Sequence, residues 1–292
     1  MIGVAWSVGA NYTHTRGSSL DVIRAPNRDA TGLRIEGVQP FTWQSAEGKS
    51  VLHSATVRLQ RRAVRGLGGQ LSYTIARSRD NAPSIGGGGG GSGVVAQNDQ
   101  DLEAEWGLSN FDRRHRLSAN LTYELPFGPN RRWLANGGTW AALLANWRLS
   151  TTFSADSGTP LTARVRGASR DVAQGLNGAL RANYDGEPIG IEDATIDRFF
   201  NIAAFSVPPT GLFGTSARNI IIGPGSRQLD GQLSRDVRLG GTRALSIQIR
   251  ATNLLNLVNY TNVDTFVNSP TFGQILSVRP MRSAQLNLRF RF

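Results

Sequence analysis

The sequence predicts an all-β protein, an antiparallel β-barrel that spans a membrane. Segments of alternating apolar and polar residues recur along the chain, short turns alternate with long connections, and no apolar run approaches the roughly 18 residues of a membrane helix. Because the side chains of a strand point to opposite faces with period two, each such segment has one apolar and one polar face. Strands of a transmembrane barrel need an apolar outside and a watery inside.

The carboxyl-terminal residues 284–292 show this pattern without a break. One face of the predicted strand is apolar and comprises Ala284, Leu286, Leu288, Phe290 and Phe292. The other face carries Asn287, Arg289 and Arg291. The two arginines need water, which the inside of a barrel supplies.

Other segments alternate in the same way, and together they predict about eight spanning strands of roughly ten residues, the length that a tilted strand needs to cross a bilayer. In chain order the other segments are 4–12, 51–60, 70–75, 116–125, 147–153, 229–239 and 245–252. Residues 161–165 look like a continuation of the segment 147–153. Residues 33–43 are also strand-like but contain Pro40, so we expect them to lie in a loop, because proline removes a ladder donor.

The predicted connections alternate in length. Tight turns are expected at 65–68 and 240–243, a medium connection at 126–145, and long extracellular loops at 16–50, 77–112, 167–227 and 256–282. Short turns at one rim and long loops at the other are typical of outer-membrane barrels. The carboxyl terminus then lies at the periplasmic rim.

Charge and composition limit the classes of molecule that the protein is expected to bind. The net charge is +11 and the sequence pI about 11.2, and Lys49 is the only lysine. Nucleic-acid binders usually gather their basic residues in one tract or on one face, whereas the arginines here are scattered over strand ends, turns and predicted inward-facing positions, so we expect no nucleic-acid partner. We expect arginines to line the lumen and to meet the phosphates of outer-membrane lipid and lipopolysaccharide.

No catalytic, cofactor-binding or metal site is expected, and we do not expect an enzyme. The chain has no cysteine, which excludes disulfides and thiolate ligands. Four acidic residues of one connection could bind calcium, but they lack the glycine-punctuated spacing of a calcium loop. These are Asp99, Asp101, Glu103 and Glu105.

Several short motifs, taken in order, resemble the TonB-dependent outer-membrane receptors of the Oar-like type, which contain a carboxypeptidase-regulatory domain. They cover about residues 67–292. The motifs are NFDRRHRL at 110–117, YELPFG at 123–128, RWL at 132–134, NWRLS at 146–150, SGTPLT at 157–162, RFFNIAAF at 198–205, FG at 213–214, RN at 218–219, ATNLLNLVN at 251–259 and SPTFG at 269–273.

The resemblance implies that residues 1–292 are the carboxyl-terminal portion of a large transporter barrel. Its plug domain, the segment that contacts the TonB complex and the remaining strands would then be missing. No secretory signal peptide is recognisable before the first predicted strand, so we expect an amino-terminally truncated or processed chain. The ligand is unknown. The alternative is a self-contained eight-stranded outer-membrane barrel with a structural or adhesive role; a soluble β-rich enzyme is the third reading.

Two further groups of residues carry predictions about the barrel. The terminal aromatic strand resembles the signal by which the outer-membrane assembly machinery recognises its substrates, and its residues are Leu286, Leu288, Phe290 and Phe292. Trp6 and Trp147 lie at ends of predicted strands, where aromatic rings form a girdle at the membrane interface.

Overall fold

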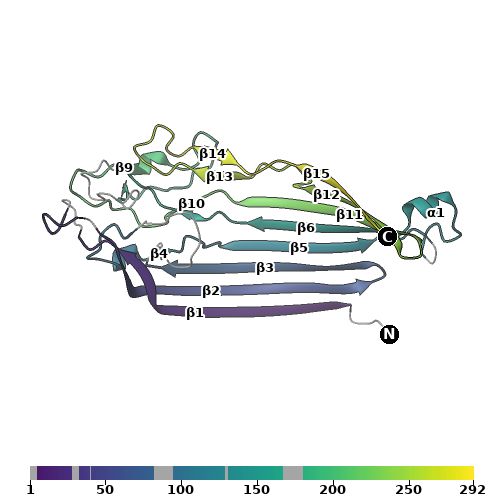
Figure 1. Ribbon diagram of the computed structural model, residues 1–292. Coiled ribbons are helices and arrows are strands. Elements are labelled where there is room, and N and C mark those ends of the chain that lie inside the picture. The colour runs from purple at the N-terminus through teal and green to yellow at the C-terminus, as the bar shows by residue number, and fades with distance from the viewer. Residues whose placement is uncertain (1–4, 28–32, 40, 82–94, 129–130, 167–179) are drawn as a thin grey trace.

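A single large antiparallel sheet forms the body of the protein, and long connections are gathered at one end of it (Figure 1). The computed structural model describes residues 5–27, 33–39, 41–81, 95–128, 131–166 and 180–292. Eight strands follow one another across the sheet, which confirms the predicted antiparallel architecture. They are β1 (Trp6–Arg24), β2 (Trp43–Val64), β3 (Leu67–Asp80), β5 (His115–Glu124), β6 (Trp147–Asp156), β11 (Ser226–Gly240), β12 (Arg243–Thr252) and β15 (Ser283–Arg291).

The connections separate into two rims, as the sequence predicts. At the turn rim, β2 and β3 are joined by Arg65 and Gly66, whose φ angles of 53° and 79° are those of the type I′ hairpin turn. The same rim holds the turn 241–242, helix α1 (Thr139–Leu144) in the connection between β5 and β6, the beginning of β1 and the end of β15 (Figure 1). The opposite loop rim holds the described parts of the connections 25–42, 81–114, 157–225 and 253–282.

The register keeps all eight strands in phase. Directly paired residues of antiparallel strands point to the same face. One row across the sheet runs through Val8, Leu59, Leu71, Ala119, Phe153 and Leu229. The neighbouring row on the other side runs through Ser7, Gln60, Gln70, Asn120, Thr152 and Asp230. We call these two sides the apolar face and the polar face.

The register also reaches the last strand. A second apolar row runs through Leu67, Tyr123, Leu149, Leu233, Ile249 and Leu286. The predicted division of side chains is therefore correct. Leu117, Leu121, Tyr123, Leu286, Leu288 and Phe290 share the apolar face, and Asn120, Thr122, Asn287 and Arg289 share the polar face.

Two strands are much longer than the alternation predicts. β1 has 19 residues and β2 has 22, so the loop expected at 16–50 shrinks to 25–42. The register of this pair shifts between Gly17 and Leu20 and again between Leu20 and Val22. These bulges break the period-two pattern while the pairing continues, and a prediction based on alternation therefore stops too early.

The expected continuation of β6 through residues 161–165 is wrong. β6 ends at Asp156, and β7 (Pro160–Leu161) pairs instead with β10 (Ile221–Ile222), outside the main sheet. At Gly158 the chain passes so close to another segment that a Cβ atom would lie 1.6 Å from the carbonyl oxygen of Gly223. Residues 161–165 still alternate between apolar and polar because Ala163 and Val165 are buried among the loop-rim connections.

The stretch 33–43 agrees with the loop prediction, since strand pairing resumes only at Trp43; Pro40 itself lies outside the described residues. Within the described ranges, no helix is long and apolar enough to cross a membrane.

The two faces make a direct prediction at neighbouring positions of β5. Leu121→Arg is expected to lower the free energy of unfolding by about 2–4 kcal/mol, because the guanidinium would enter hydrocarbon. Asn120→Arg should cost far less, because the polar face meets water. Urea titrations of refolding into lipid vesicles measure both, and equal costs at the two positions would contradict the assignment of the faces.

Candidate functional site

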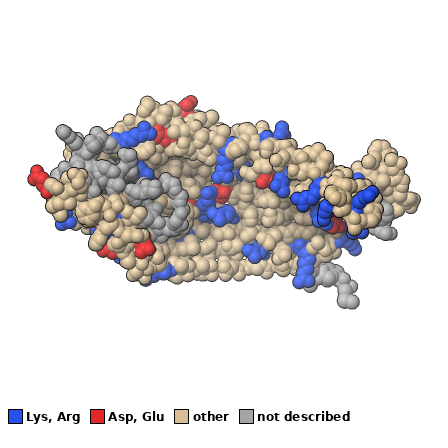
Figure 2. Space-filling model, viewed as in Figure 1, with Lys and Arg blue, Asp and Glu red and all other residues tan. Residues whose placement is uncertain are grey.

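The polar face of the sheet carries charge from end to end. Its arginines are Arg58, Arg116, Arg148, Arg250 and Arg289. Glu124 on β5 is held by Arg131 at 2.9 Å and by Arg148 at 3.2 Å, near the turn rim. Figure 2 shows lysine and arginine side chains over the viewed side of the sheet and gathered at its turn-rim end. Such a face needs contact with water, because its charged side chains would be costly to bury.

The loop-rim connections fold into a small structured unit, which we call the cap (residues 95–114, 157–166, 180–225 and 253–282). Its strands are β4 (Gly107–Leu108), β7, β8 (Asn183–Tyr184), β9 (Phe205–Ser206), β10, β13 (Tyr260–Val263) and β14 (Ile275–Val278), and it also contains the 3-10 turns η1 (Glu103–Glu105) and η2 (Ile202–Ala204). Its core is apolar and includes Ala163, Ala182, Phe200, Phe205, Ile221 and Val263. The cap is therefore packed like a small domain.

Inside this core, three phenylalanines pack together although they come from two different loop-rim connections. Phe200 lies edge-on to Phe205 and to Phe272, with ring centroids 5.9 and 5.3 Å apart. Phe200 and Phe205 precede β11, whereas Phe272 follows β12. Edge-to-face rings contribute about 0.5–1.5 kcal/mol beyond area burial. Two of the short motifs, RFFNIAAF and SPTFG, thus meet to hold the cap together.

A buried ion pair joins two other parts of the cap. Arg181 Nη1 lies 2.5 Å from Glu105 Oε1, and the side chains are 7% and 3% exposed. The Arg181 Nε also donates to the carbonyl oxygen of Ser216 at 2.8 Å. The backbone N–H of Gln97 donates to Glu105 Oε1 at 2.9 Å. A buried charge pair needs such additional hydrogen bonds, because its desolvation is costly.

A second buried pair fastens the cap to the sheet. Arg218 pairs with Asp80, the last residue of β3, and its Nε donates to the carbonyl oxygen of Glu105 at 2.9 Å. Asp80 and Ser78 extend from the polar face of β3, and Ser78 is hydrogen-bonded to Ser109 at 2.8 Å. The cap therefore covers the loop-rim end of the polar face.

The RN motif continues this junction. Asn219 accepts a hydrogen bond from Thr162 at 2.9 Å and donates to Asn110 at 2.7 Å. Thr162 belongs to the SGTPLT motif and Asn110 to NFDRRHRL, so three motifs far apart in sequence converge here. At Gly214, of the FG motif, a Cβ atom would lie 1.9 Å from the carbonyl oxygen of Arg181, which only glycine permits.

Two cap residues have shifted pKa values. Burial lowers the pKa of Arg164, and the neighbouring Arg218 adds to this effect while Glu105 opposes it. Burial alone raises the pKa of Asp264, but hydrogen bonds from Ser269 and Thr271 outweigh it and hold the pKa below its usual value. The Asp264 carboxylate thus stabilises the cap above its unfolded pKa of about 3.9, and this contribution is lost as the pH falls through the lower folded value.

The four acidic residues considered for calcium point to separate partners. Asp99 pairs with Arg24 at 2.8 Å, Glu103 with Lys49 at 2.6 Å and Glu105 with Arg181. Asp101 accepts from the Ala104 amide at 3.2 Å. The described residues hold no group of three or more potential metal-ligating side chains.

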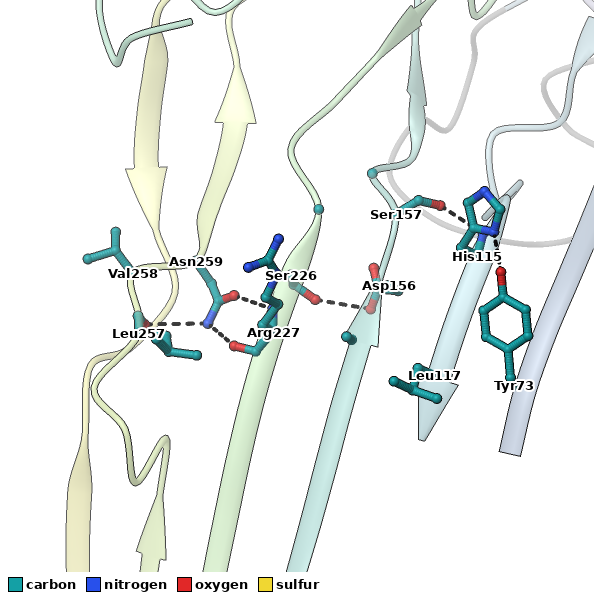
Figure 3. Close-up of a pocket in the computed structure, with 13 residues that line it drawn as sticks. Tyr73, His115, Leu117, Asp156, Ser157, Ser226, Arg227, Leu257, Val258 and Asn259 are labelled. Carbon is teal, nitrogen blue, oxygen red and sulfur yellow. Dashed lines mark hydrogen bonds between the residues drawn. The ribbon is translucent and has the colours of Figure 1, made fainter. Parts of the chain in front are cut away.

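On the apolar face, at the loop rim, lies a groove with a volume of about 520 Å³ (Figure 3). Its floor follows one register row through Tyr73, Leu117, Ala155 and Arg227, on β3, β5, β6 and β11. His115 lies beside this row and is hydrogen-bonded through Nδ1 to the Tyr73 hydroxyl at 2.8 Å. The floor thus combines apolar side chains with hydrogen-bonding groups.

One wall of the groove is the connection that follows β12. The Asn259 side chain accepts from the Arg227 amide at 2.7 Å and donates to the Arg227 carbonyl at 2.9 Å, which fixes this connection beside β11 (Figure 3). Leu257 and Val258 border the groove from this wall. Asp156 also borders it, but Arg113 and Ser226 bind its carboxylate. The Arg227 guanidinium has no ion-pair partner among the described residues.

The structure places both predicted interface tryptophans at the turn rim of the apolar face. Trp6 begins β1 beneath the guanidinium of Arg61, and Trp147 begins β6 with its Nε1 donating to the Leu143 carbonyl at 3.0 Å. Trp133 and Trp140 are exposed in the connection between β5 and β6 at the same rim, and the prediction did not include them. Both lie between two strands, in a stretch without alternating apolar and polar residues, so the sequence pattern did not mark them as strand-end aromatics.

The predicted assembly residues form the apolar edge of the last strand. Leu286 and Leu288 pair with Ile249 and Ile247, and Phe290 pairs with Leu245. Phe292 follows the strand and is 92% exposed. Their role in assembly stays a prediction.

Sequence reasoning did not single out Arg181, Glu105 or Arg218 as joined residues, nor Arg227 as part of a groove. The motifs marked Arg218 and Asn219, but their partners Glu105 and Asn110 lie more than a hundred residues away. Arg227 sits at a strand start with nothing in its neighbours to indicate a cavity.

These features together define a class of protein. An antiparallel sheet of eight successive strands, with an apolar face, a polar face, tight turns at one rim and folded connections at the other, is the wall of a transmembrane β-barrel. The family described as outer membrane beta barrel domain matches residues 2–285. The chain belongs to this family and is located in the bacterial outer membrane.

Among solved structures, the chain is similar to the outer membrane transporter YddB from Escherichia coli, with 12% sequence identity and a TM-score of 0.48. The match covers 99% of this chain and 30% of that transporter's chain, so this sequence spans less than a third of its length. No curated protein matches the chain.

The buried ion pair of the cap makes a testable prediction. Glu105→Gln leaves Arg181 buried without a charged partner and is expected to lower the free energy of unfolding by about 3–5 kcal/mol. Glu103→Gln, on the same short turn, removes only an exposed pair with Lys49 and should cost about 0–1 kcal/mol. Protease resistance of the cap in urea measures both. Equal resistance of the two variants would contradict the role of Glu105.

Proposed function

We propose that the chain forms part of the barrel of a TonB-dependent outer-membrane receptor that takes up a large ligand. The observation that carries this proposal is that the sheet is open at both edges. Among the described residues, β1 and β15 each pair with one neighbour only, although hydrocarbon does not tolerate unpaired strand edges. Further strands must therefore pair with both edges, or the two edges must pair with each other.

The side chains of the polar face favour further strands. In a closed eight-stranded barrel the interior is just wide enough for side chains to fill it. Here five arginines, Arg58, Arg116, Arg148, Arg250 and Arg289, lie on the polar face, and their long charged side chains need more room and water than such an interior offers. A wide barrel gives such residues water, and the cap then stands at the entrance of the passage, where a ligand arrives. The ordered motifs are the remaining support, since they resemble this receptor family.

The partners of this function are proposals as well. The TonB complex would act through the plug and the amino-terminal segment that the resemblance implies. The ligand is of unknown identity. Lipid and lipopolysaccharide surround the apolar face, and the assembly machinery inserts the barrel. The proposal includes neither catalysis nor a nucleic-acid partner.

A self-contained eight-stranded barrel with a structural or adhesive role is the second candidate, because eight strands are enough to close. Disulfide trapping separates the two, since the chain has no cysteine of its own. In the full protein, Val8→Cys should form no bond with a cysteine at Leu286, Leu288 or Phe290. The matched pair Ile247→Cys and Leu288→Cys, which face each other across β12 and β15, should crosslink.

Crosslinking of Val8 to the last strand would establish the self-contained barrel instead. The uptake function has its own measurement. The full-length protein should bind the periplasmic domain of TonB, and removal of its segment amino-terminal to the barrel should abolish this binding. Absence of TonB binding by the intact protein would contradict the receptor function.

The terminal aromatic makes a prediction about assembly. Phe292→Asp places a charge at the exposed end of the last strand, where an assembly receptor could capture it by edge pairing, and should reduce the membrane-inserted fraction. Arg291→Ala, on the polar face, is the matched control and should insert like the parent. The measurement is inserted against total protein. Normal insertion of Phe292→Asp would remove the support for this signal.

A further inference from the structure

We propose that the groove at the loop rim of the apolar face binds the phosphorylated headgroup of one lipopolysaccharide molecule, with Arg227 as the phosphate ligand. The first argument is position. The groove lies on the side of the sheet that meets lipid, at the end where the long extracellular connections begin. A ligand there comes from the outer leaflet of the outer membrane, whose lipid carries phosphates on an acylated sugar.

The second argument is charge. The Arg227 guanidinium is exposed and has no ion-pair partner in the described part of the chain, and a planar guanidinium suits bidentate contact with phosphate. Asp156, the carboxylate that borders the groove, is already bound by Arg113 and Ser226. An anionic group thus meets one available cation and no competing free carboxylate in the groove.

The third argument is the shape of the floor. Leu117 and Ala155 lie beside Arg227 in the same register row and offer apolar contact. The apolar row Leu71, Ala119 and Phe153 continues from them toward the membrane interior. This surface suits the methylenes of an acyl chain. Tyr73 and His115, joined by their hydrogen bond, offer polar atoms at the level where a headgroup sugar would lie.

The neighbouring strand extends the positive surface beyond the groove. Arg77 and Arg79 follow Tyr73 on the apolar face of β3, and both are exposed. Arg77 lies directly opposite His53 across the β2–β3 pair. Within the described ranges neither arginine has a carboxylate partner. A second phosphate of the same headgroup, or that of an adjacent molecule, would find cations here.

The test uses the full protein in detergent, with native mass spectrometry to measure binding of bisphosphorylated lipid A. Arg227→Gln should bind about tenfold more weakly, the loss expected for a hydrogen bond to a charged group. Arg227→Lys should retain most of the affinity. The matched control is Arg116→Gln, because Arg116 lies at the same level of the sheet but on the polar face, and it should bind like the parent.

A second arm needs no variant. Lipid A stripped of its phosphates should bind the parent protein about as weakly as bisphosphorylated lipid A binds the Arg227→Gln variant. Equal binding of the two lipids, unchanged binding after Arg227→Gln, or an equal loss after Arg116→Gln would each overturn the proposal. The inference rests on the outer-membrane location alone. Failure of TonB binding would therefore leave it standing, and failure of lipid A binding would leave the receptor proposal standing.

Discussion

Backbone hydrogen bonding in hydrocarbon is the constraint on which this structure depends. Inside a bilayer no water is available to N–H and C=O groups, so every spanning strand must pair along its length with a neighbour. Pairing in register then fixes which side chains share a face, because the side-chain period is two and a slip of one residue would exchange the faces. The rows from Val8 to Leu229 and from Ser7 to Asp230 show that no such slip occurs across six strands.

Charged residues on the apolar face follow the same constraint. Arg61 and Arg235 lie at the turn rim, beside Trp6 and Trp147, and Arg77 and Arg79 lie near the loop rim. Long arginine side chains at these positions reach the interfaces, while the middle of the face stays apolar. The net charge of +11 is thus placed where water or phosphate is available.

The cap obeys a different rule, because it stands outside the hydrocarbon. Two of its arginines, Arg181 and Arg218, are buried against carboxylates and carbonyl oxygens from other connections. Buried pairs of this kind tolerate few substitutions, since each partner left alone would be a desolvated charge. The three phenylalanines add an apolar core beside them. Long connections that would otherwise be loose are thereby held over the polar face.

The alternation of apolar and polar residues in the sequence determined the eight spanning strands, their two faces and the tight turns. It could do so because the period of two is a local property of each strand, visible in that strand's own residues. It failed where bulges lengthen β1 and β2, and at residues 161–165, where burial in the cap imitates a strand. The positions of Trp6 and Trp147 at strand ends were readable from the sequence. Only the tertiary structure decided the partners of Arg181 and Arg218 and the groove around Arg227. These depend on contacts between residues distant in sequence, which leave no periodic trace along the chain.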